Sequence, residues 1–134
     1  MVRHYLSPST LGILDGDVEP DLVAQALVAD GAGPVRVRAG LDPERALVVF
    51  REAGSGALRG MHCLGDAVGR SEVGEVSEAR GTYLRLGDYG TGREVVRSIV
   101  ARFGGWFLPS DRGGLEWERI PSPSDGDGPD APAP

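Results

Sequence analysis

Apolar and polar residues alternate along the chain with two different periods, which predicts a mixture of helices and strands. The clearest helical pattern follows Thr91, where apolar residues recur every three or four positions as far as Phe103. Thr91 and Glu94 have capping-box spacing, in which each side chain satisfies a free backbone donor at the helix start. Gly104 and Gly105 then favour the left-handed backbone that ends helices. We therefore expect an amphipathic helix that ends at Phe103.

A second helix is predicted from Pro20 to Asp30. Proline suits the first turn of a helix because its backbone lacks an N–H that would have no partner there. Asp17 or Glu19 is available as the capping residue, and apolar residues recur at helical spacing after Pro20. Gly31 supplies the stop signal.

Alternation with a period of two predicts strands in most of the remaining chain. Val35–Ala39 alternates apolar and charged residues, whereas Ala46–Phe50 is apolar on both faces, as in a central strand. The glycines around Ser55 predict a hairpin that leads into Ala57–Leu64. The region Gly65–Glu78 is interrupted by glycine and is predicted to be a loop. The other expected strands are Val2–Leu6, an edge strand near Val73–Val76, Thr82–Leu86, Trp106–Leu108 and Leu115–Glu118.

These elements predict one α+β domain over residues 1–120. We expect an antiparallel or mixed sheet of five to seven strands with two amphipathic helices on one face, because amphipathic elements must cover one another. A length of 134 residues supports a single domain. Beyond Ile120 the chain is rich in Pro, Asp and Gly and offers little apolar area, so residues 121–134 are predicted to be a disordered tail.

Charge and the lengths of apolar runs exclude some classes of binding partner. The formal net charge is −6, and all 14 cationic residues are arginines that look scattered in the sequence. Binding to nucleic acid needs clustered cations, so no nucleic-acid partner is expected. The longest apolar run, Ala46–Phe50, is too short to cross a bilayer, and the N-terminus lacks the apolar region of a signal peptide. We therefore expect a cytoplasmic protein that does not bind membranes.

The sequence contains no recognisable catalytic arrangement. Cys63 adjoins His62, but neighbouring side chains in a strand point to opposite faces, so Cys63 is expected to be a structural core residue. One Cys and two His give no spacing typical of a zinc site. The acidic run Asp125–Asp130 lacks the features of a calcium loop. No catalytic residue, metal or cofactor is predicted, and an enzyme is not the favoured interpretation.

Both tryptophans and two of the three phenylalanines lie close together near the C-terminal end. One interpretation is a packed hydrophobic corner. The other is an exposed anchor for a protein partner, because aromatic and Arg residues dominate the energetics of protein interfaces. The predicted binding residues are Tyr89, Arg93, Trp106, Asp111, Arg112 and Trp117.

Two alternatives stay open at this point. The segment Gly90–Arg93 lies where a strand passes into a helix, and the N-terminus of a helix can bind an anion or an anionic small molecule. Thr91 and Glu94 explain the same segment as a capping box, and Glu94 would repel an anion. The second alternative is a homodimer that forms through an exposed strand edge.

The segment Tyr83–Glu118 resembles a pattern seen in small bacterial domains of uncharacterised or toxin-immunity type. The residues that carry the resemblance are the strand Tyr83–Leu86, the amphipathic helix, the exit Phe103–Phe107 and the loop at Asp111. Such domains often have a denser acidic cluster after the glycine pair, where this chain has Ser110, Asp111 and Arg112. The resemblance implies a small, non-catalytic, immunity-like module that binds a protein partner.

Overall fold

A seven-stranded antiparallel sheet organises the residues that the computed structural model describes, which are 9–39, 44–73, 78–87, 93–108 and 117–123. The spatial order of the strands is β2-β3-β4-β5-β1-β6-β7. The strands are β1 (Ser9–Leu14), β2 (Val35–Ala39), β3 (Arg45–Arg51), β4 (Leu58–Leu64), β5 (Tyr83–Gly87), β6 (Gly105–Leu108) and β7 (Glu118–Ile120). The helices are α1 (Pro20–Ala29), α2 (Asp66–Val73) and α3 (Arg93–Phe103). This arrangement confirms the predicted α+β class.

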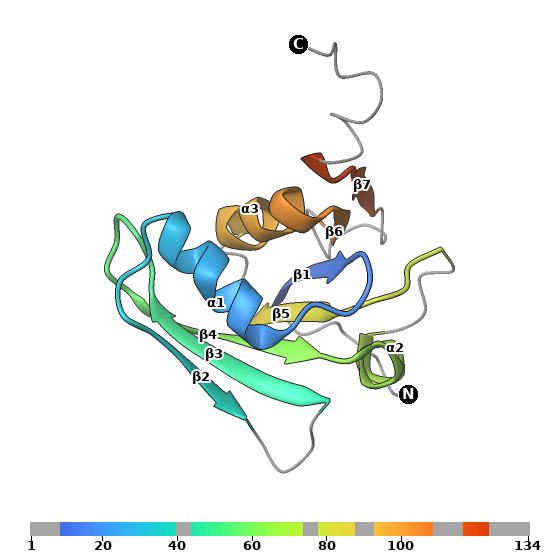
Figure 1. The fold of residues 1–134 in the computed structure, drawn as a ribbon, viewed down its shortest axis with the longest axis horizontal. Helices are drawn as coiled ribbons and strands as arrows, with labels where there is room; N and C mark the ends of the chain where they lie inside the picture. Colours follow the sequence, from blue (N-terminus) through green and yellow to red (C-terminus); the bar gives the residue numbers. More distant parts are fainter. Residues whose placement is uncertain (1–8, 40–43, 74–77, 88–92, 109–116, 124–134) are drawn as a thin grey trace, which may run out of the picture.

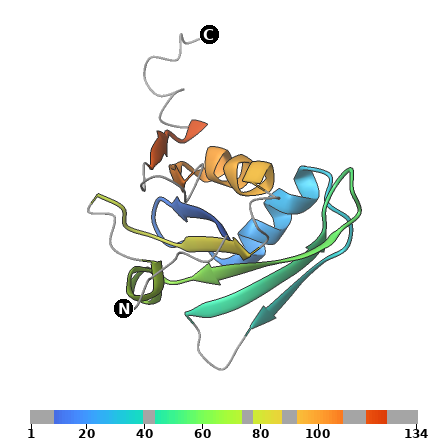
Figure 2. The ribbon, with the colours of Figure 1, turned by 180° about the vertical axis from the view of Figure 1, so that it is seen from behind.

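Helices α1 and α3 cover one face of the sheet, as predicted (Figures 1 and 2). Helix α1 packs over β2 and β3, whereas α3 packs over β1, β5 and β6. The apolar stripe of α3 lies against the sheet, and its residues Val96, Ile99 and Val100 are fully buried. The main core therefore lies between these two helices and the sheet, and it also contains Leu27, Phe50, Met61, Cys63, Leu84 and Phe107.

Gly12 allows α3 to approach the sheet closely. A Cβ atom at this position would lie 2.7 Å from a methyl carbon of Val100 and 2.8 Å from one of Val96. Both valines are completely buried and have no room to move. The absence of a side chain at Gly12 thus sets the spacing between β1 and α3.

The prediction for Gly65–Glu78 is wrong where the structure describes that region. Residues Asp66–Val73 form the helix α2 instead of a loop, and residues 74–77 lie outside the described part. The sequence pattern did not predict this helix because Gly69 lies within it and glycine disfavours helices. Its presence has a packing reason: a Cβ atom there would lie 2.2 Å from the Cγ atom of Tyr83. Helix α2 therefore packs directly against the ring of Tyr83, on the face of the sheet opposite α1 and α3.

Three other differences concern strands and helix ends. Strand β1 was not predicted, and the expected strand Val2–Leu6 lies outside the described residues. Of the predicted strand Leu115–Glu118, residues 115 and 116 lie outside the described part, Trp117 is not in a strand, and Glu118 begins β7. Glu19 occupies the N-cap of α1, but its side chain makes no capping hydrogen bond. Thr91 of the predicted capping box and the predicted tail beyond Pro123 also lie outside the described residues.

We predict that Gly69→Ala destabilises the protein, although alanine normally stabilises a helix by about 1 kcal/mol relative to glycine. The new methyl group would collide with the buried ring of Tyr83, and overpacking of this kind costs roughly 1–3 kcal/mol. Urea unfolding should show a lower free energy of unfolding for this variant. Ser71→Ala, at an exposed position of the same helix, is the matched control and should leave stability unchanged or slightly raised. A stabilised Gly69→Ala variant would contradict the described packing of α2.

Candidate binding surface

The two tryptophans lie together in a second, smaller cluster on the face of the sheet opposite α1 and α3. Trp106 and Trp117 are both half-buried and pack against Ile13, Leu64 and Tyr83. Neither indole is sealed from water, and neither projects freely into it. The described structure thus has features of both interpretations of the aromatic corner, because each indole packs inward and also keeps part of its surface accessible.

Arg119 covers the outer side of Trp106. Its guanidinium carbon lies 5.5 Å from the centre of the Trp106 ring, within the range of a cation–π contact. The same guanidinium donates two hydrogen bonds to the carboxylate of Asp15, at 2.7 and 2.9 Å. This paired geometry fixes the arginine over the ring. Sequence reasoning did not identify Arg119, because nothing in the sequence indicates that β7 places it opposite Trp106.

The other predicted binding residues do not join this cluster in the described structure. Arg93 is exposed at the start of α3, whereas Trp106 follows the end of that helix. Eleven helical residues separate the two ends by about 16 Å. Tyr89, Asp111 and Arg112 lie outside the described residues. Of the three predicted binding residues that the structure describes, it brings together Trp106 and Trp117 and leaves Arg93 apart.

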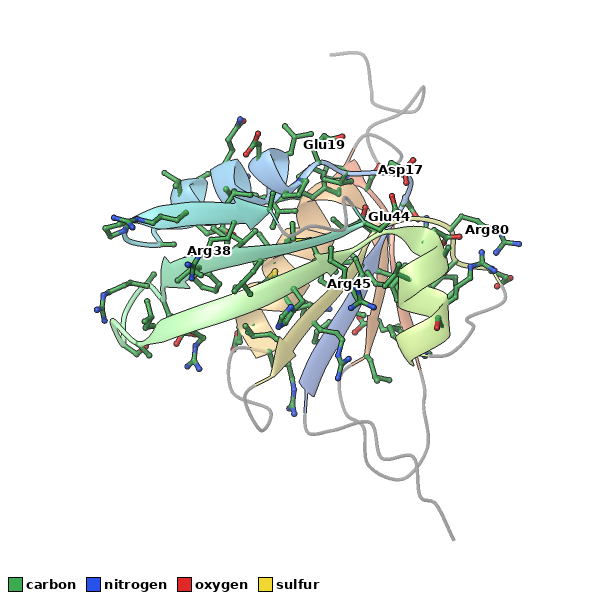
Figure 3. The ribbon with its side chains drawn as sticks, turned by 90° about the horizontal axis from the view of Figure 1, so that it is seen from below. Asp17, Glu19, Arg38, Glu44, Arg45 and Arg80 are labelled. Atoms are coloured by element: carbon green, nitrogen blue, oxygen red, sulfur yellow. The ribbon has the colours of Figure 1, made fainter. Side chains whose placement is uncertain are left out.

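Five arginines and a histidine share the side of the sheet that faces away from α1 and α3. Cys63 and Leu84 point into the main core, so the side chains next to them in the strands, His62 and Arg85, point to the opposite side. The strand registers align Arg38, Leu47, His62 and Arg85 in one row across strands β2 to β5. With strands about 4.8 Å apart, this row spans roughly 14 Å. We call this surface the arginine face, and its members are Arg36, Arg38, Arg45, Arg51, His62 and Arg85. Figure 3 labels two of them, Arg38 and Arg45.

The strands that form the arginine face contain no carboxylate. Strands β2 to β5 include neither Asp nor Glu. Apolar side chains lie between the cations: Leu47 and Val49 are half-buried, and Leu58 is 62% exposed. A hollow of about 340 Å³ lies at one end of the face and is lined by Arg38, Ala39, Arg45, Ala46, Leu47 and His62.

An acidic hollow adjoins the arginine face. It has a volume of about 450 Å³ and shares Ala46 with the basic hollow. Four carboxylates belong to its lining, those of Asp17, Glu19, Glu44 and Asp66. Asp66 already accepts a hydrogen bond from the backbone N–H of Gly81 at 3.0 Å. Surfaces of opposite charge therefore meet near the start of β3, as the labelled residues in Figure 3 show.

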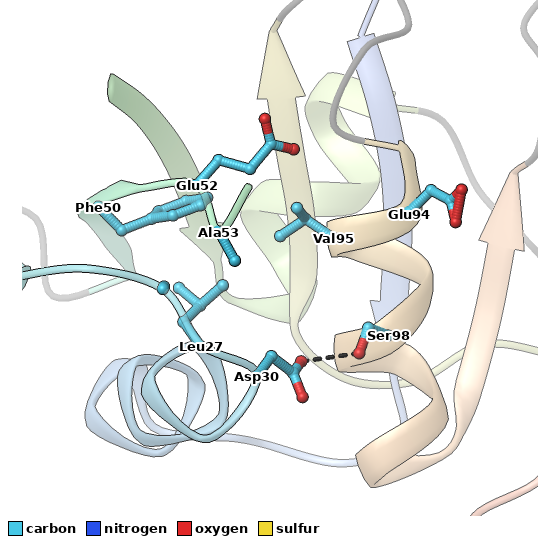
Figure 4. A pocket seen from close by; sticks show the side chains of 9 residues that line it. Leu27, Asp30, Phe50, Glu52, Ala53, Glu94, Val95 and Ser98 are labelled. Carbon is cyan, nitrogen blue, oxygen red and sulfur yellow. Dashed lines mark hydrogen bonds between the residues drawn. The ribbon is translucent and has the colours of Figure 1, made fainter. Parts of the chain in front are cut away.

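A third hollow, of about 230 Å³, lies between α1, α3 and the β3–β4 hairpin (Figure 4). Its lining includes Glu94, which directly follows the predicted anion site Gly90–Arg93, and two further carboxylates, Asp30 and Glu52. Hydrogen bonds from Arg59 and Ser55 lower the pKa of Glu52 and keep it ionised. Arg102 and Arg59 already pair with Asp30 and Glu52, and the charge of Glu94 opposes the binding of an added anion.

The environments of Cys63 and His62 agree with the predicted structural role of the cysteine. Cys63 is buried beneath the helices, whereas His62 is exposed on the arginine face. Burial raises the pKa of the Cys63 thiol to about 12, so the thiol stays protonated at neutral pH and is a poor nucleophile. Within the described ranges, no group of three or more His, Cys, Asp or Glu side chains is arranged to hold a metal ion. None of the described helices combines the length and apolar character needed to cross a bilayer.

Asp30 joins α1 to α3 and should make stability depend on pH. Burial of this carboxyl opposes ionisation, but hydrogen bonds from Arg102 and Ser98 outweigh it and lower the pKa below 3.8. The Ser98 hydroxyl donates to Asp30 at 2.7 Å (Figure 4). Because the folded-state pKa is depressed, the contact stabilises the protein above the unfolded-state pKa, and this stabilisation is lost as the pH falls through the folded-state pKa.

We therefore predict that Asp30→Asn lowers the urea midpoint at neutral pH and that the difference from the wild type shrinks as the pH falls below the usual pKa of an aspartate. Asp17→Asn is the matched control because it removes an exposed carboxylate that takes no part in this contact. Equal effects of the two substitutions at neutral pH would argue against the described link between α1 and α3.

Comparison with known proteins does not assign the chain to a family. No protein-family model, no curated protein and no solved structure matches it. The function is therefore inferred from the surfaces of the described structure.

Proposed function

We propose that the protein is a non-catalytic protein-binding module whose arginine face binds an acidic segment of a partner protein. The observation that carries this proposal is the composition of that face, which gathers five arginines and His62 on strands without a single carboxylate. Charged side chains of one sign repel one another when they share a surface. A partner with carboxylates is attracted to a surface of this composition, and such complementarity also favours rapid association.

Apolar side chains among the arginines support a protein partner. Leu47 and Val49 offer apolar area between the cations, and Leu58 is largely exposed beside them. Protein interfaces combine apolar contact with Arg anchors in this manner. Trp106 and Arg119 lie on the same face of the sheet, further along it, so the predicted aromatic corner can extend the contact area.

Nucleic acid fits the arginine face less well. Proteins that bind single strands stack the bases on aromatic rings. Among the members of the arginine face His62 alone has a ring, and Trp106, further along the sheet, is covered by Arg119. The rest of the surface is acidic enough to give the chain a net charge of −6, which repels a polyanion that extends beyond the face. A short acidic protein segment can avoid that repulsion.

A toxin as the partner, which the resemblance of Tyr83–Glu118 to immunity-type domains implies, stays a prediction. The alternative function, an anion site at Gly90–Arg93, gains no support from its described neighbourhood. Arg93 is the only described residue of that segment, and the hollow beside it is lined by carboxylates.

A fluorescein-labelled peptide of ten glutamates tests the proposal by fluorescence anisotropy. We predict that the wild-type protein binds this peptide and that binding weakens as salt is added, because exposed charge pairs are screened. The double variant Arg38→Gln/Arg45→Gln should bind about tenfold more weakly, since it removes two charge contacts worth up to about 1 kcal/mol each.

Arg93→Gln/Arg97→Gln is the matched control, because it removes the same charge from the exposed side of α3. It should change the affinity by less than about twofold. An equal loss in both double variants would show that only net charge matters and would overturn the proposed site. Tighter binding of a ten-nucleotide oligothymidine than of the peptide would overturn the proposal in favour of nucleic acid.

A further inference from the structure

We infer that the acidic partner segment binds as an added strand along the free edge of β2, with its carboxylates on the arginine face. The inference rests on the proposed function and specifies how the partner is held. It follows from the position of β2 in the sheet, from the direction of its arginines and from the unfavourable pairing of β2 with a second copy of itself.

Strand β2 is one end of the sheet. It pairs with β3 on one side, and no described strand lies on its other side. An edge strand presents unpaired backbone N–H and C=O groups, and an extended segment of another chain can pair with them. The main chain of such a segment supplies affinity, and its alternate side chains supply specificity.

The alternation within β2 determines which side chains the added strand needs. Arg36 and Arg38 are exposed and point to the arginine face, whereas Val35 and Val37 point toward α1 and are half-buried. Side chains of directly opposite residues lie on the same face of a sheet. The added strand therefore carries acidic residues opposite the two arginines and apolar residues opposite the two valines, which is a strictly alternating pattern.

A second copy of the chain does not satisfy this pattern. If two β2 strands paired in antiparallel orientation around Val37, Arg36 of one copy would lie opposite Arg38 of the other, twice in the same interface. Like charges directly opposite each other destabilise a strand pair. Arginines at these positions thus oppose self-association through this edge and favour an acidic strand of a different chain.

The residues next to β2 on the arginine face also favour an acidic strand. Arg45 is exposed on the next strand and lines the same hollow as Arg38, so a carboxylate opposite Arg38 lies near both cations. Leu47 lies directly opposite Arg38 across the β2–β3 pair. The hollow of about 340 Å³ formed there leaves space for a long acidic side chain at the edge of the sheet.

Two labelled peptides of identical composition separate strand addition from simple charge attraction. The first alternates, Glu-Val-Glu-Val-Glu-Val-Glu, and the second is blocked, Glu-Glu-Glu-Glu-Val-Val-Val. Both have the same charge and length, and both are kept below the concentration at which light scattering detects assembly. We expect the full-length protein to bind the alternating peptide at least about tenfold more tightly, because only this peptide places every carboxylate on one side of a strand.

Backbone methylation provides a second readout. One edge of a strand presents only every other N–H group to its neighbour. Methylating one alternate set of amides in the alternating peptide should therefore abolish the preference, whereas methylating the other set should preserve it. Equal effects of the two methylation patterns would overturn strand addition.

The outcomes distinguish this inference from the proposed function. Equal affinities for the alternating and the blocked peptide, both lost in Arg38→Gln/Arg45→Gln, would overturn strand addition and leave the arginine face as the binding site. Failure of every acidic peptide to bind the wild-type protein would overturn the proposed function itself. A concentration-dependent dimer that the alternating peptide dissociates would show that the edge pairs with a second copy, which contradicts the argument from Arg36 and Arg38.

Discussion

The packing of α3 against the sheet determines which face every strand presents. Gly12 lets the buried valines of α3 approach β1, and the neighbours of Gly12 in the sheet are Leu84 on one side and Phe107 on the other. Because this row lies under the helices, the strand pairing also places its next members, Cys63 and Ala46, on the helix side of the sheet. A slip of one residue would turn every side chain of a strand to the opposite face. The positions of the arginines on the other face are thus a consequence of apolar burial.

Local patterns in the sequence were sufficient for the elements that face the main core. The helix predicted for Pro20–Asp30 ends one residue earlier, at Ala29, and the amphipathic helix ends at Phe103 as expected. Both have an apolar stripe long enough to dominate the local pattern. The prediction failed where tertiary contact outweighs local preference, as in α2, whose Gly69 is explained only by the ring of Tyr83. Local preference alone carries no information about such a contact.

The candidate surface was harder to predict than the fold because it depends on strand register. Arg38, His62 and Arg85 are far apart in the sequence and become neighbours only through three specific strand pairs. Residue types alone did identify the aromatic corner, since the tryptophans are few and close together in the sequence. The contact of Arg119 with Trp106 depends on the pairing of β6 with β7, and the predicted strand Leu115–Glu118 overlaps β7 at Glu118 and does not reach Arg119.

Protection of the sheet edge explains only part of the arginine face. Charged residues on an edge strand prevent unwanted pairing, and this accounts for Arg36 and Arg38 on β2 without any partner. The same reasoning does not apply to Arg45, His62 and Arg85, because β3, β4 and β5 are interior strands whose edges are already paired. Charged side chains on these interior strands therefore need another explanation than edge protection. The proposed binding of an acidic segment supplies one, so Arg45 and Arg85, more than the arginines on the edge, are the residues that link the arginine face to that proposal.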